Sequence, residues 1–455
     1  MILKICEQLI DMGEAAKISL KAIGKQDTHL LSKDPEESFF NYKTKRHSEF
    51  RKYHRSRNVV NNGTIAGWPF GQTVKVQFNP TNMGDLLSNM YLSITMPGIA
   101  NGNYADQLGR HILKSITMFV DGLEVEKIHD DWGIIYDDLY LEISEKVANR
   151  FLVNRNLGLD ESSREEEYAR SSSNLVIPLH FFFSRKYASD EYSSNKPNRP
   201  YFPVCAIHRQ KIEFELEFHQ QTFFTNFTGT LSLQSFNIVT EEITVSPEER
   251  NYLSSERQTL ITDIVKKHPT TVSDLGIDTI VNNLVPDIPV KCIHWFLRNT
   301  DFENEGDAIG SSDVNEQRLY QNRFNFSSNV SFDDQTTFFD PIMESASFYI
   351  SGNRLPNITK TNHEYYKYLI PYRTRLARPI RNIYTYSFSM NPINVEPSGN
   401  LDFSQIKSDK TSIEVKLDTS SDSLVDTSSN NYSLNMYYTG YQTYIFDKGF
   451  MSLAY

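Results

Sequence analysis

Strict alternation of apolar and polar residues is the feature that most constrains the fold of this chain. In its clearest instance, Ile212, Phe214, Leu216 and Phe218 alternate with three glutamates. A helix, with about 3.6 residues per turn, cannot place these apolar side chains on one face, whereas a strand does. The same alternation recurs at 73–78, 90–96, 347–351, 384–390 and 413–417. The long alternating helices that a parallel sheet requires are absent, so the pattern predicts an all-β chain of antiparallel β-sandwiches.

The pattern also indicates an internal duplication. Asp121-Gly122 and Ser351-Gly352 each follow an alternating strand and have the composition of a tight hairpin turn. Each hairpin is followed by an aromatic segment that could be helical, at 130–143 and 362–373, and later by a strand interrupted by glutamate. The two halves match in pattern and not in identity, which predicts two similar β domains in tandem.

Two segments have helical features. Ser246 can cap a helix, Pro247 suits its first turn and Glu249 completes a capping box, so a helical connector is predicted over about 247–266. The N-terminal segment 3–24 has apolar residues at helical spacing and is expected to dock on another surface. The polar tract 419–431 is expected to be an exposed loop.

Composition and charge limit the classes of function. The chain has 455 residues, 57 acidic and 46 basic, with a net charge of −11, which disfavours a globally basic nucleic-acid binder. Its three cysteines are few and far apart, which indicates a reducing compartment and no disulfide scaffold. Neither a signal peptide nor a run of about 18 apolar residues is recognisable, so no membrane-spanning helix is expected.

A search for catalytic, cofactor or metal sites predicts none. Phosphate-binding loops, nucleophile elbows and zinc-protease motifs are missing. Cys205 and His208 lack a second ligand pair, so a buried thiol beside a polar histidine is the better interpretation. His129-Asp130-Asp131 is interpreted as a polar turn before a short helix. The acid pairs Asp137-Asp138 and Asp333-Asp334 are interpreted as solvated loop acids, since no calcium-loop ligand series surrounds them.

Two basic clusters remain. The first, within 43–57, could contact nucleic acid, an acidic protein or an anionic membrane, or could be a solvated face, and both interpretations carry similar weight. Its members are Lys43, Lys45, Arg46, Arg51, Lys52, Arg55 and Arg57. The second cluster could form inter-subunit ion pairs, although ordinary surface charge explains it equally well. Its members are Arg373, Arg375, Arg378 and Arg381.

These motifs together resemble the double jelly-roll major capsid proteins of nucleocytoplasmic large DNA viruses, virophages and Polinton-like viruses. The most specific match is YTYSFSMNPINVEPSGNLDFSQI at 384–406, with its asparagine-proline and proline-serine-glycine sequences. Other segments similar to the family lie at 24–50, 86–98, 109–139, 177–185 and 202–218. The segment before residue 24 has no recognised counterpart.

The resemblance implies a fold and a division into domains. It implies two tandem eight-stranded antiparallel jelly-roll β-sandwiches joined by a short helical linker, with an N-terminal helical arm. The expected boundaries are 1–45 for the arm, 46–240 for the first jelly roll, 241–266 for the linker and 267–455 for the second jelly roll.

The resemblance also implies a structural role without catalysis or cofactors. Such chains form homotrimeric, pseudo-hexagonal capsomers that tile an icosahedral shell, assembled in the host cytoplasm. The implied partners are neighbouring capsomers and minor capsid or penton proteins, with an inner viral membrane as a further candidate and no specific nucleic-acid recognition. The arm and the cluster at 43–57 are expected to point inward. Two alternatives stay open: a carbohydrate-binding β-sandwich protein, and an assembly scaffold not retained in the mature virion.

Overall fold

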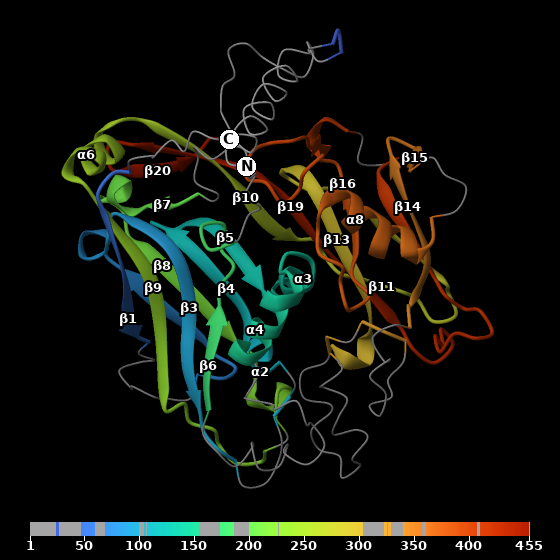
Figure 1. The fold of residues 1–455 in the computed structure, drawn as a ribbon. Helices are drawn as coiled ribbons and strands as arrows, with labels where there is room; N and C mark the ends of the chain where they lie inside the picture. Colours follow the sequence, from blue (N-terminus) through green and yellow to red (C-terminus); the bar gives the residue numbers. More distant parts are fainter. Residues whose placement is uncertain are drawn as a thin grey trace, which may run out of the picture. The chain divides into compact units, whose positions relative to one another are not determined.

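The computed structural model describes residues 24–26, 47–59, 69–99, 104–105, 107–153, 173–185, 200–225, 227–303, 323–324, 326–328, 340–356, 361–406 and 410–454. The chain divides into two units, Met1–Glu49 and Phe50–Tyr455. Most of the first unit, including the predicted N-terminal helix, lies outside the described residues. The second unit holds the labelled strands and helices of Figure 1.

The first half of this unit contains two antiparallel sheets. One has the order β1-β9-β3-β6, with a short strand β7 added to β3, and the other has the order β2-β8-β4-β5. The strands are β1 (Phe50–Asn58), β2 (Thr73–Phe78), β3 (Leu86–Met96), β4 (Leu113–Val120), β5 (Leu123–His129), β6 (Ser173–Pro178), β7 (Phe202–Pro203), β8 (Ile212–Phe218) and β9 (Ser235–Val245).

The second half repeats this plan. Its sheets have the orders β10-β19-β13-β16 and β12-β18-β14-β15, with the short strands β11, β17 and β20 added to the first. The strands are β10 (Gln258–Lys267), β11 (Thr271–Val272), β12 (Thr279–Asn283), β13 (Pro289–Asn299), β14 (Met343–Ile350), β15 (Asn353–Leu355), β16 (Tyr384–Ser387), β17 (Leu401–Asp402), β18 (Ser412–Leu417), β19 (Tyr432–Asp447) and β20 (Phe450–Leu453).

Once the short added strands are set aside, the two halves have the same topology. In each half the first strand pairs with the last, as β1 with β9 and β10 with β19. The last strand pairs on its other side with the third strand of that half, β3 or β13. The second sheet likewise places the second strand beside the seventh. Each half is therefore a jelly-roll sandwich, and the predicted duplication is confirmed at the level of strand order.

The hairpins that suggested the duplication are equivalent in the fold. The β4–β5 turn places Asp121 at φ 51° and Gly122 at φ 85°, and the β14–β15 turn places Ser351 at φ 50° and Gly352 at φ 83°. Positive φ at both central residues defines the predicted type I′ turn, whose twist matches that of the strands it joins. The two turns occupy the same position in their respective jelly rolls.

Helical segments lie mainly in the connections between strands. They are α2 (Leu108–Ile112), α3 (Asp130–Leu139), α4 (Ile143–Val153), α6 (Pro247–Ser255) and α8 (Ile370–Thr374), which follows a π-helical turn at Tyr365–Leu369. The 3-10 turns are Pro80–Asn82, Val204–Ile207, Gln221–Phe223, Thr300–Phe302 and Phe403–Gln405. Among the described residues, no helix is long and apolar enough to cross a membrane.

The helix predicted over 247–266 is half as long as expected. Ser246 caps it, accepting a hydrogen bond from the Glu249 amide at 3.3 Å, and Pro247 occupies the first turn, as predicted. The helix ends at Ser255, and Gln258–Lys267 forms strand β10, paired with β19 along its length. The apolar spacing of 260–265 fits either structure, and the pairing with β19 decides for a strand.

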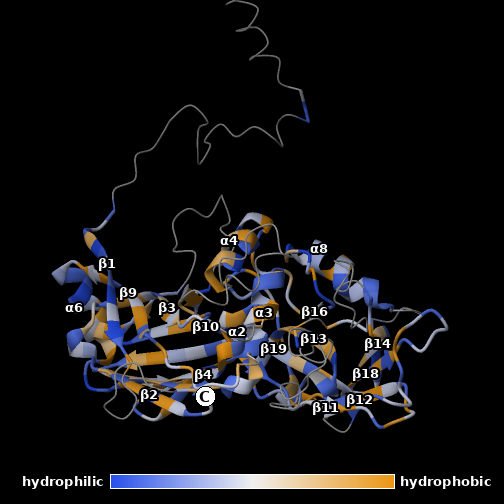
Figure 2. Cartoon of the chain, turned by 90° about the horizontal axis from the view of Figure 1, so that it is seen from below, coloured by the Kyte–Doolittle hydropathy of each residue, from blue (hydrophilic) through white to orange (hydrophobic). Residues whose placement is uncertain are grey.

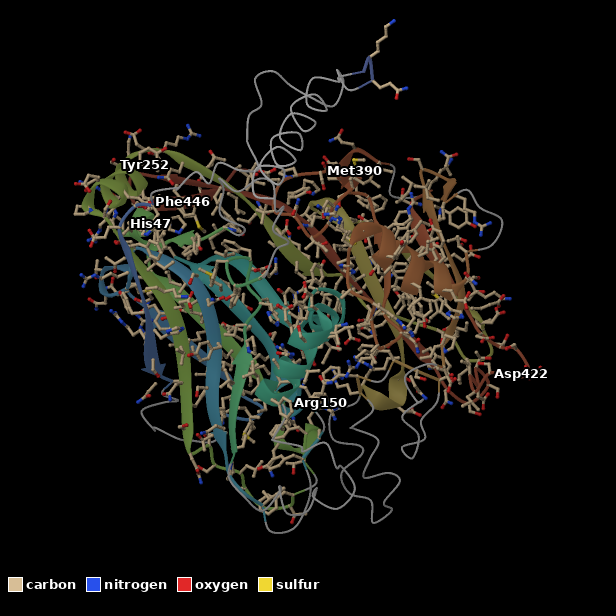
Figure 3. The ribbon with its side chains drawn as sticks, viewed as in Figure 1. His47, Arg150, Tyr252, Met390, Asp422 and Phe446 are labelled. Atoms are coloured by element: carbon tan, nitrogen blue, oxygen red, sulfur yellow. The ribbon has the colours of Figure 1, made fainter. Side chains whose placement is uncertain are left out.

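The buried residues form two hydrophobic cores. One lies within the second sandwich, and the other combines the first sandwich with residues of the second half that face it, such as Phe296 and Tyr437. Strand β8 buries Ile212, Phe214, Leu216 and Phe218 and leaves its glutamates half exposed, as its alternation predicts. Figure 2 shows hydrophobic and hydrophilic segments along the strands of both halves. The loop 419–431 is largely exposed, as predicted, and its Asp422 lies at the outer end of the second half (Figure 3).

Candidate functional site: the junction between the two halves

Helix α3 lies between the two jelly rolls (Figure 1). All ten of its residues are buried, although four of them are aspartates. A buried carboxylate is costly unless it is paired and hydrogen-bonded. The residues that pair with these four aspartates therefore show which parts of the chain α3 joins.

Asp131 binds to three strands of the second half. Its carboxylate lies 2.5 Å from Arg298 Nη2 on β13 and 3.7 Å from Lys267 Nζ on β10. Tyr437 on β19 donates its hydroxyl to the same carboxylate at 3.3 Å. One side chain of the first jelly roll thus contacts three adjacent strands of one sheet of the second.

Two neighbouring aspartates make further links across the junction. Asp130 accepts from Arg323 Nη2 at 2.9 Å and lies 3.0 Å from His219 Nε2. Asp138 accepts from both Nη1 and the backbone amide of Arg381, each at 3.0 Å. The guanidinium of Arg381 also donates to the Phe324 carbonyl, so it is held from both sides.

The fourth aspartate anchors the helix to its own half. Asp137 receives two hydrogen bonds from Arg110, both at 3.0 Å, in the bidentate arrangement that is strongest for this pair. His180 stacks on Tyr136, with ring centroids 3.9 Å apart, beside the same carboxylate. The helix is therefore fixed to one jelly roll by Asp137 and to the other by Asp130, Asp131 and Asp138.

Electrostatics keep several of these acids ionised. Burial alone raises the pKa of a carboxyl, but Arg323 and His219 outweigh it and hold the pKa of Asp130 well below its usual range. Burial likewise opposes ionisation of Asp131 and Asp137, and Arg298 and Arg110 respectively lower the pKa of each. The junction thus contains full charges that are neutralised by fixed partners.

A second charged layer joins β5 to β10. Glu126 pairs with Arg185 and accepts from the Val265 amide at 3.1 Å, while Arg185 Nη1 donates to the Asp263 carbonyl at 3.0 Å. The side chain of Asp263 pairs with Lys291. Burial raises the pKa of Glu126 and of Asp263, so here desolvation outweighs the cationic partners.

Neutral polar groups complete the contact. His294 on β13 lies 3.0 Å from the Tyr140 hydroxyl and 2.9 Å from Thr385 Oγ1. Burial, followed by the nearby charge of Lys291, lowers the pKa of His294 to about 3, so the ring is neutral at physiological pH. Trp132 packs against the His294 and Tyr437 rings, with centroids 5.9 Å and 6.1 Å apart.

The arrangement is suited to holding the two jelly rolls rigidly against each other. Every acid on α3 is saturated by fixed protein groups, and breaking such a pair leaves an uncompensated buried charge. Within the described residues, no group of three or more His, Cys, Asp or Glu side chains could hold a metal ion.

Two interpretations of these acids from sequence are corrected. Asp130 and Asp131 belong to a buried helix and not to a polar turn, and Asp137 and Asp138 are buried and not solvated. Their arginine partners other than Arg110 lie 167 to 243 positions away, so no local pattern could reveal them. Asp333 and Asp334 lie outside the described residues.

Three members of the first basic cluster, all among its described residues, pair with acids of the same chain. Lys43, Lys45 and Arg46 lie outside the described residues, and the other members lie on β1. Arg57 Nη2 is 2.9 Å from Glu242 and Lys52 Nζ is 3.2 Å from Glu241, both buried acids of β9. Arg55 lies 3.8 Å from Glu242, and Arg51 is exposed.

The second basic cluster separates into two kinds of residue. Arg373, Arg375 and Arg378 are exposed, and Arg378 stacks on the Tyr368 ring. Arg381 is buried and pairs with Asp138 of its own chain, so its observed partner is intramolecular. The structure therefore leaves three of the four candidate inter-subunit arginines at the surface.

Comparison with known proteins gives a consistent result. A family model described as the major capsid protein N-terminus matches residues 38–254, and one described as the large eukaryotic DNA virus major capsid protein matches residues 248–451. The major capsid protein of Pyramimonas orientalis virus is 22% identical over 415 residues, covering 86% of this chain and 89% of that protein. That of Paramecium bursaria Chlorella virus 1 is 20% identical, covering 87% of this chain and 86% of that protein.

Solved structures with the same fold include the PBCV-1 virus capsid, at a TM-score of 0.70 and 18% identity, covering 92% of this chain and all of that chain. The Faustovirus major capsid protein has a TM-score of 0.62 and 11% identity, covering 95% of this chain and 98% of that chain. Identities this low support the shared fold alone.

Proposed function

The chain belongs to the family of major capsid proteins of large eukaryotic DNA viruses, and we propose that three copies of it form a pseudo-hexagonal capsomer. Its place is in the virion capsid, where it assembles with neighbouring subunits. The single observation that carries the proposal is the pair of jelly rolls with identical strand order, joined through a buried charged helix.

The two jelly rolls of each chain form two similar lobes, and this similarity allows a trimer to imitate six-fold symmetry. Three chains with two similar lobes each present six similar lobes around one axis, so a trimer can occupy a six-fold position in a shell. Such a ring closes through one heterologous contact repeated three times. The ring is regular only if the angle between the two lobes is fixed, and the ion pairs of α3 supply that constraint.

Further partners follow from this assignment. We propose that the capsomers tile an icosahedral shell assembled in the host cytoplasm, and that the chain catalyses no reaction. Residues 1–45, with Lys43 and Lys45, would contact minor capsid or penton proteins or an inner viral membrane. Removing residues 1–45 should leave trimers intact and impair shells, whereas normal trimers and normal shells would argue against this role.

The oligomeric state tests the core of the proposal. Native mass spectrometry of the purified chain should give about three times 52.6 kDa. A stable monomer or dimer at micromolar concentration would contradict it.

A further inference from the structure

The two jelly rolls are equivalent in topology but not in exposure. Helix α3 follows the β4–β5 hairpin and is buried along its whole length. The helical segment Tyr365–Thr374 follows the equivalent β14–β15 hairpin. It buries Tyr366 and Ile370 against its own half, yet Leu369 is 44% exposed and Tyr372 is 83% exposed. One face of the second helix therefore lacks the cover that α3 has.

The surface that covers α3 can be located on the second jelly roll. Cys292, His294 and Phe296 on β13 and Tyr437 on β19 are each fully buried, and they lie on the face of the sheet that points away from its own core. Trp132 and Tyr140 contact this face. The outer face of β10-β19-β13 is thus the receptor for the first helix.

A shared bulge gives the residue-by-residue equivalence of the two sheets. The β13–β19 register shifts between Val290 and Cys292, and the β3–β9 register shifts between Leu87 and Asn89. Aligning these bulges makes Asn89 equivalent to Cys292, so Tyr91 corresponds to His294 and Ser93 to Phe296. The pairings Tyr91↔Val239 and His294↔Tyr437 then make Val239 equivalent to Tyr437.

The equivalent face of the first jelly roll is more exposed than its counterpart, although Val239 in it is only 8% exposed. Asn89, Tyr91 and Ser93 are partly exposed, whereas their counterparts on β13 are fully buried. On β1, Ser56 is exposed and His54, whose side chain is 51% exposed, packs beside Tyr91. In Figure 1 the sheet with β1, β9 and β3 lies at the edge of the first half that is remote from the second half.

One chain therefore carries an uncovered helix face on its second half and an uncovered receptor face on its first half. The same two kinds of surface are already joined once, inside the chain, by α3. Repeating that contact between chains joins the second half of one copy to the first half of the next. Contacts of this head-to-tail kind close into a ring when the rotation permits.

We propose that the exposed face of the helical segment Tyr365–Thr374, with Arg373, Arg375 and Arg378 at its border, docks on the outer face of β1-β9-β3 of a second copy of this chain. Tyr372 is the most exposed apolar residue of the helix face, and Ser93 is a partly exposed residue of β3 on the receptor face. This inference rests on the proposed trimer and adds to it the two surfaces that meet.

Crosslinking tests the contact directly. In a Cys6→Ser background, the remaining native cysteines Cys205 and Cys292 are buried. Tyr372→Cys combined with Ser93→Cys, treated with a short thiol-to-thiol crosslinker, should give covalent dimers and trimers and no larger species. The matched control combines Tyr372→Cys with Val281→Cys, a position 56% exposed on β12, and should give monomers only.

A substitution supplies the second readout. Ser93→Arg places a long, unpaired cation on the receptor face and should raise the trimer dissociation concentration at least about tenfold, because burying an unpaired charge in an interface is costly. Val281→Arg should leave it unchanged, and both variants should keep the wild-type melting temperature of the monomer.

The outcomes separate the two claims. A trimeric wild type in which the Tyr372–Ser93 pair does not crosslink between chains, or crosslinks no better than the Val281 control, overturns this inference and leaves the trimer standing. If Ser93→Arg leaves the trimer dissociation concentration unchanged, this inference is likewise overturned and the trimer still stands. A wild type that is monomeric overturns the proposed capsomer, and this contact with it.

Discussion

At the scale of single residues, paired buried charges determine how the two jelly rolls meet. Asp138 and Arg381 illustrate the principle: both side chains are nearly inaccessible to water, and each supplies the other's counter-charge. Such a pair contributes little over well-packed apolar groups, but losing one partner is costly because the other stays buried and charged. The junction is therefore sensitive to single substitutions.

Arg381→Ala should lower the free energy of unfolding by about 3–5 kcal/mol, since it strands the Asp138 carboxylate in the junction. Arg257→Ala, at an exposed position, is the matched control and should change it by less than about 0.5 kcal/mol. Urea unfolding of the two variants measures the difference. Equal stabilities would show that the pair does not hold the halves together.

The buried histidine gives a pH prediction. The pKa of His294 is lowered to about 3 in the folded chain, so between the ordinary histidine value near 6.5 and about 3 only the unfolded chain takes up a proton. Its contribution to stability is complete above about pH 6.5 and is lost as the pH falls, by up to about 1.4 kcal/mol per pH unit.

Unfolding free energies measured from pH 7 to pH 4 should therefore fall less steeply for His294→Gln than for the wild type. Glutamine can still hydrogen-bond to Tyr140 and Thr385, but it does not titrate. Identical slopes for the two proteins would contradict a buried neutral histidine.

At the scale of elements, the hairpins and the first strand fix the register of each sheet. Gly122 sits at φ 85° with no atom within 4 Å of where a Cβ would lie, so only backbone strain opposes a side chain there. Gly122→Val should cost about 1–3 kcal/mol through that strain. Gly122→Asn should cost less, because asparagine tolerates this conformation. Thermal melting distinguishes them, and equal melting temperatures would refute a role for backbone strain.

Strand β1 is held by charges of unequal importance. Arg57, whose side chain is 19% exposed, pairs with the fully buried Glu242, whereas the side chain of Lys52 is 51% exposed. Arg57→Ala should lose about 2 kcal/mol and Lys52→Ala less than about 1 kcal/mol. Denaturant unfolding measures both, and a larger loss for Lys52→Ala would contradict this ranking.

Features set by neighbouring residues could be predicted from sequence, and features set by distant partners could not. The strand of Ile212–Phe218, the turn at Gly122 and the cap at Ser246 depend on residues within a few positions. The helix α6 ends where it does because the residues after it form β10, which pairs with the distant strand β19. The burial of Asp131 depends on its ion pair with the distant Arg298. The duplication can be predicted from the alternating strands and the two hairpins, whereas the face of each half that is covered depends on contacts between residues far apart in the sequence.

At the scale of the whole molecule, one polypeptide contributes two of the six lobes of the proposed pseudo-hexagonal tile. The intrachain junction fixes one contact through α3, and the proposed interchain contact repeats its geometry with the second helical segment. The shell would then depend on two related interfaces, one covalently tethered and one not. The tethered interface carries the buried charges, and the other must form and close during assembly.

Cryo-electron microscopy of the purified chain gives the sharpest test of the pseudo-hexagonal capsomer. Class averages viewed down the principal axis should show a closed ring of six similar lobes with three-fold symmetry. A ring with two-fold symmetry, an open chain of lobes or isolated pairs of lobes would contradict it.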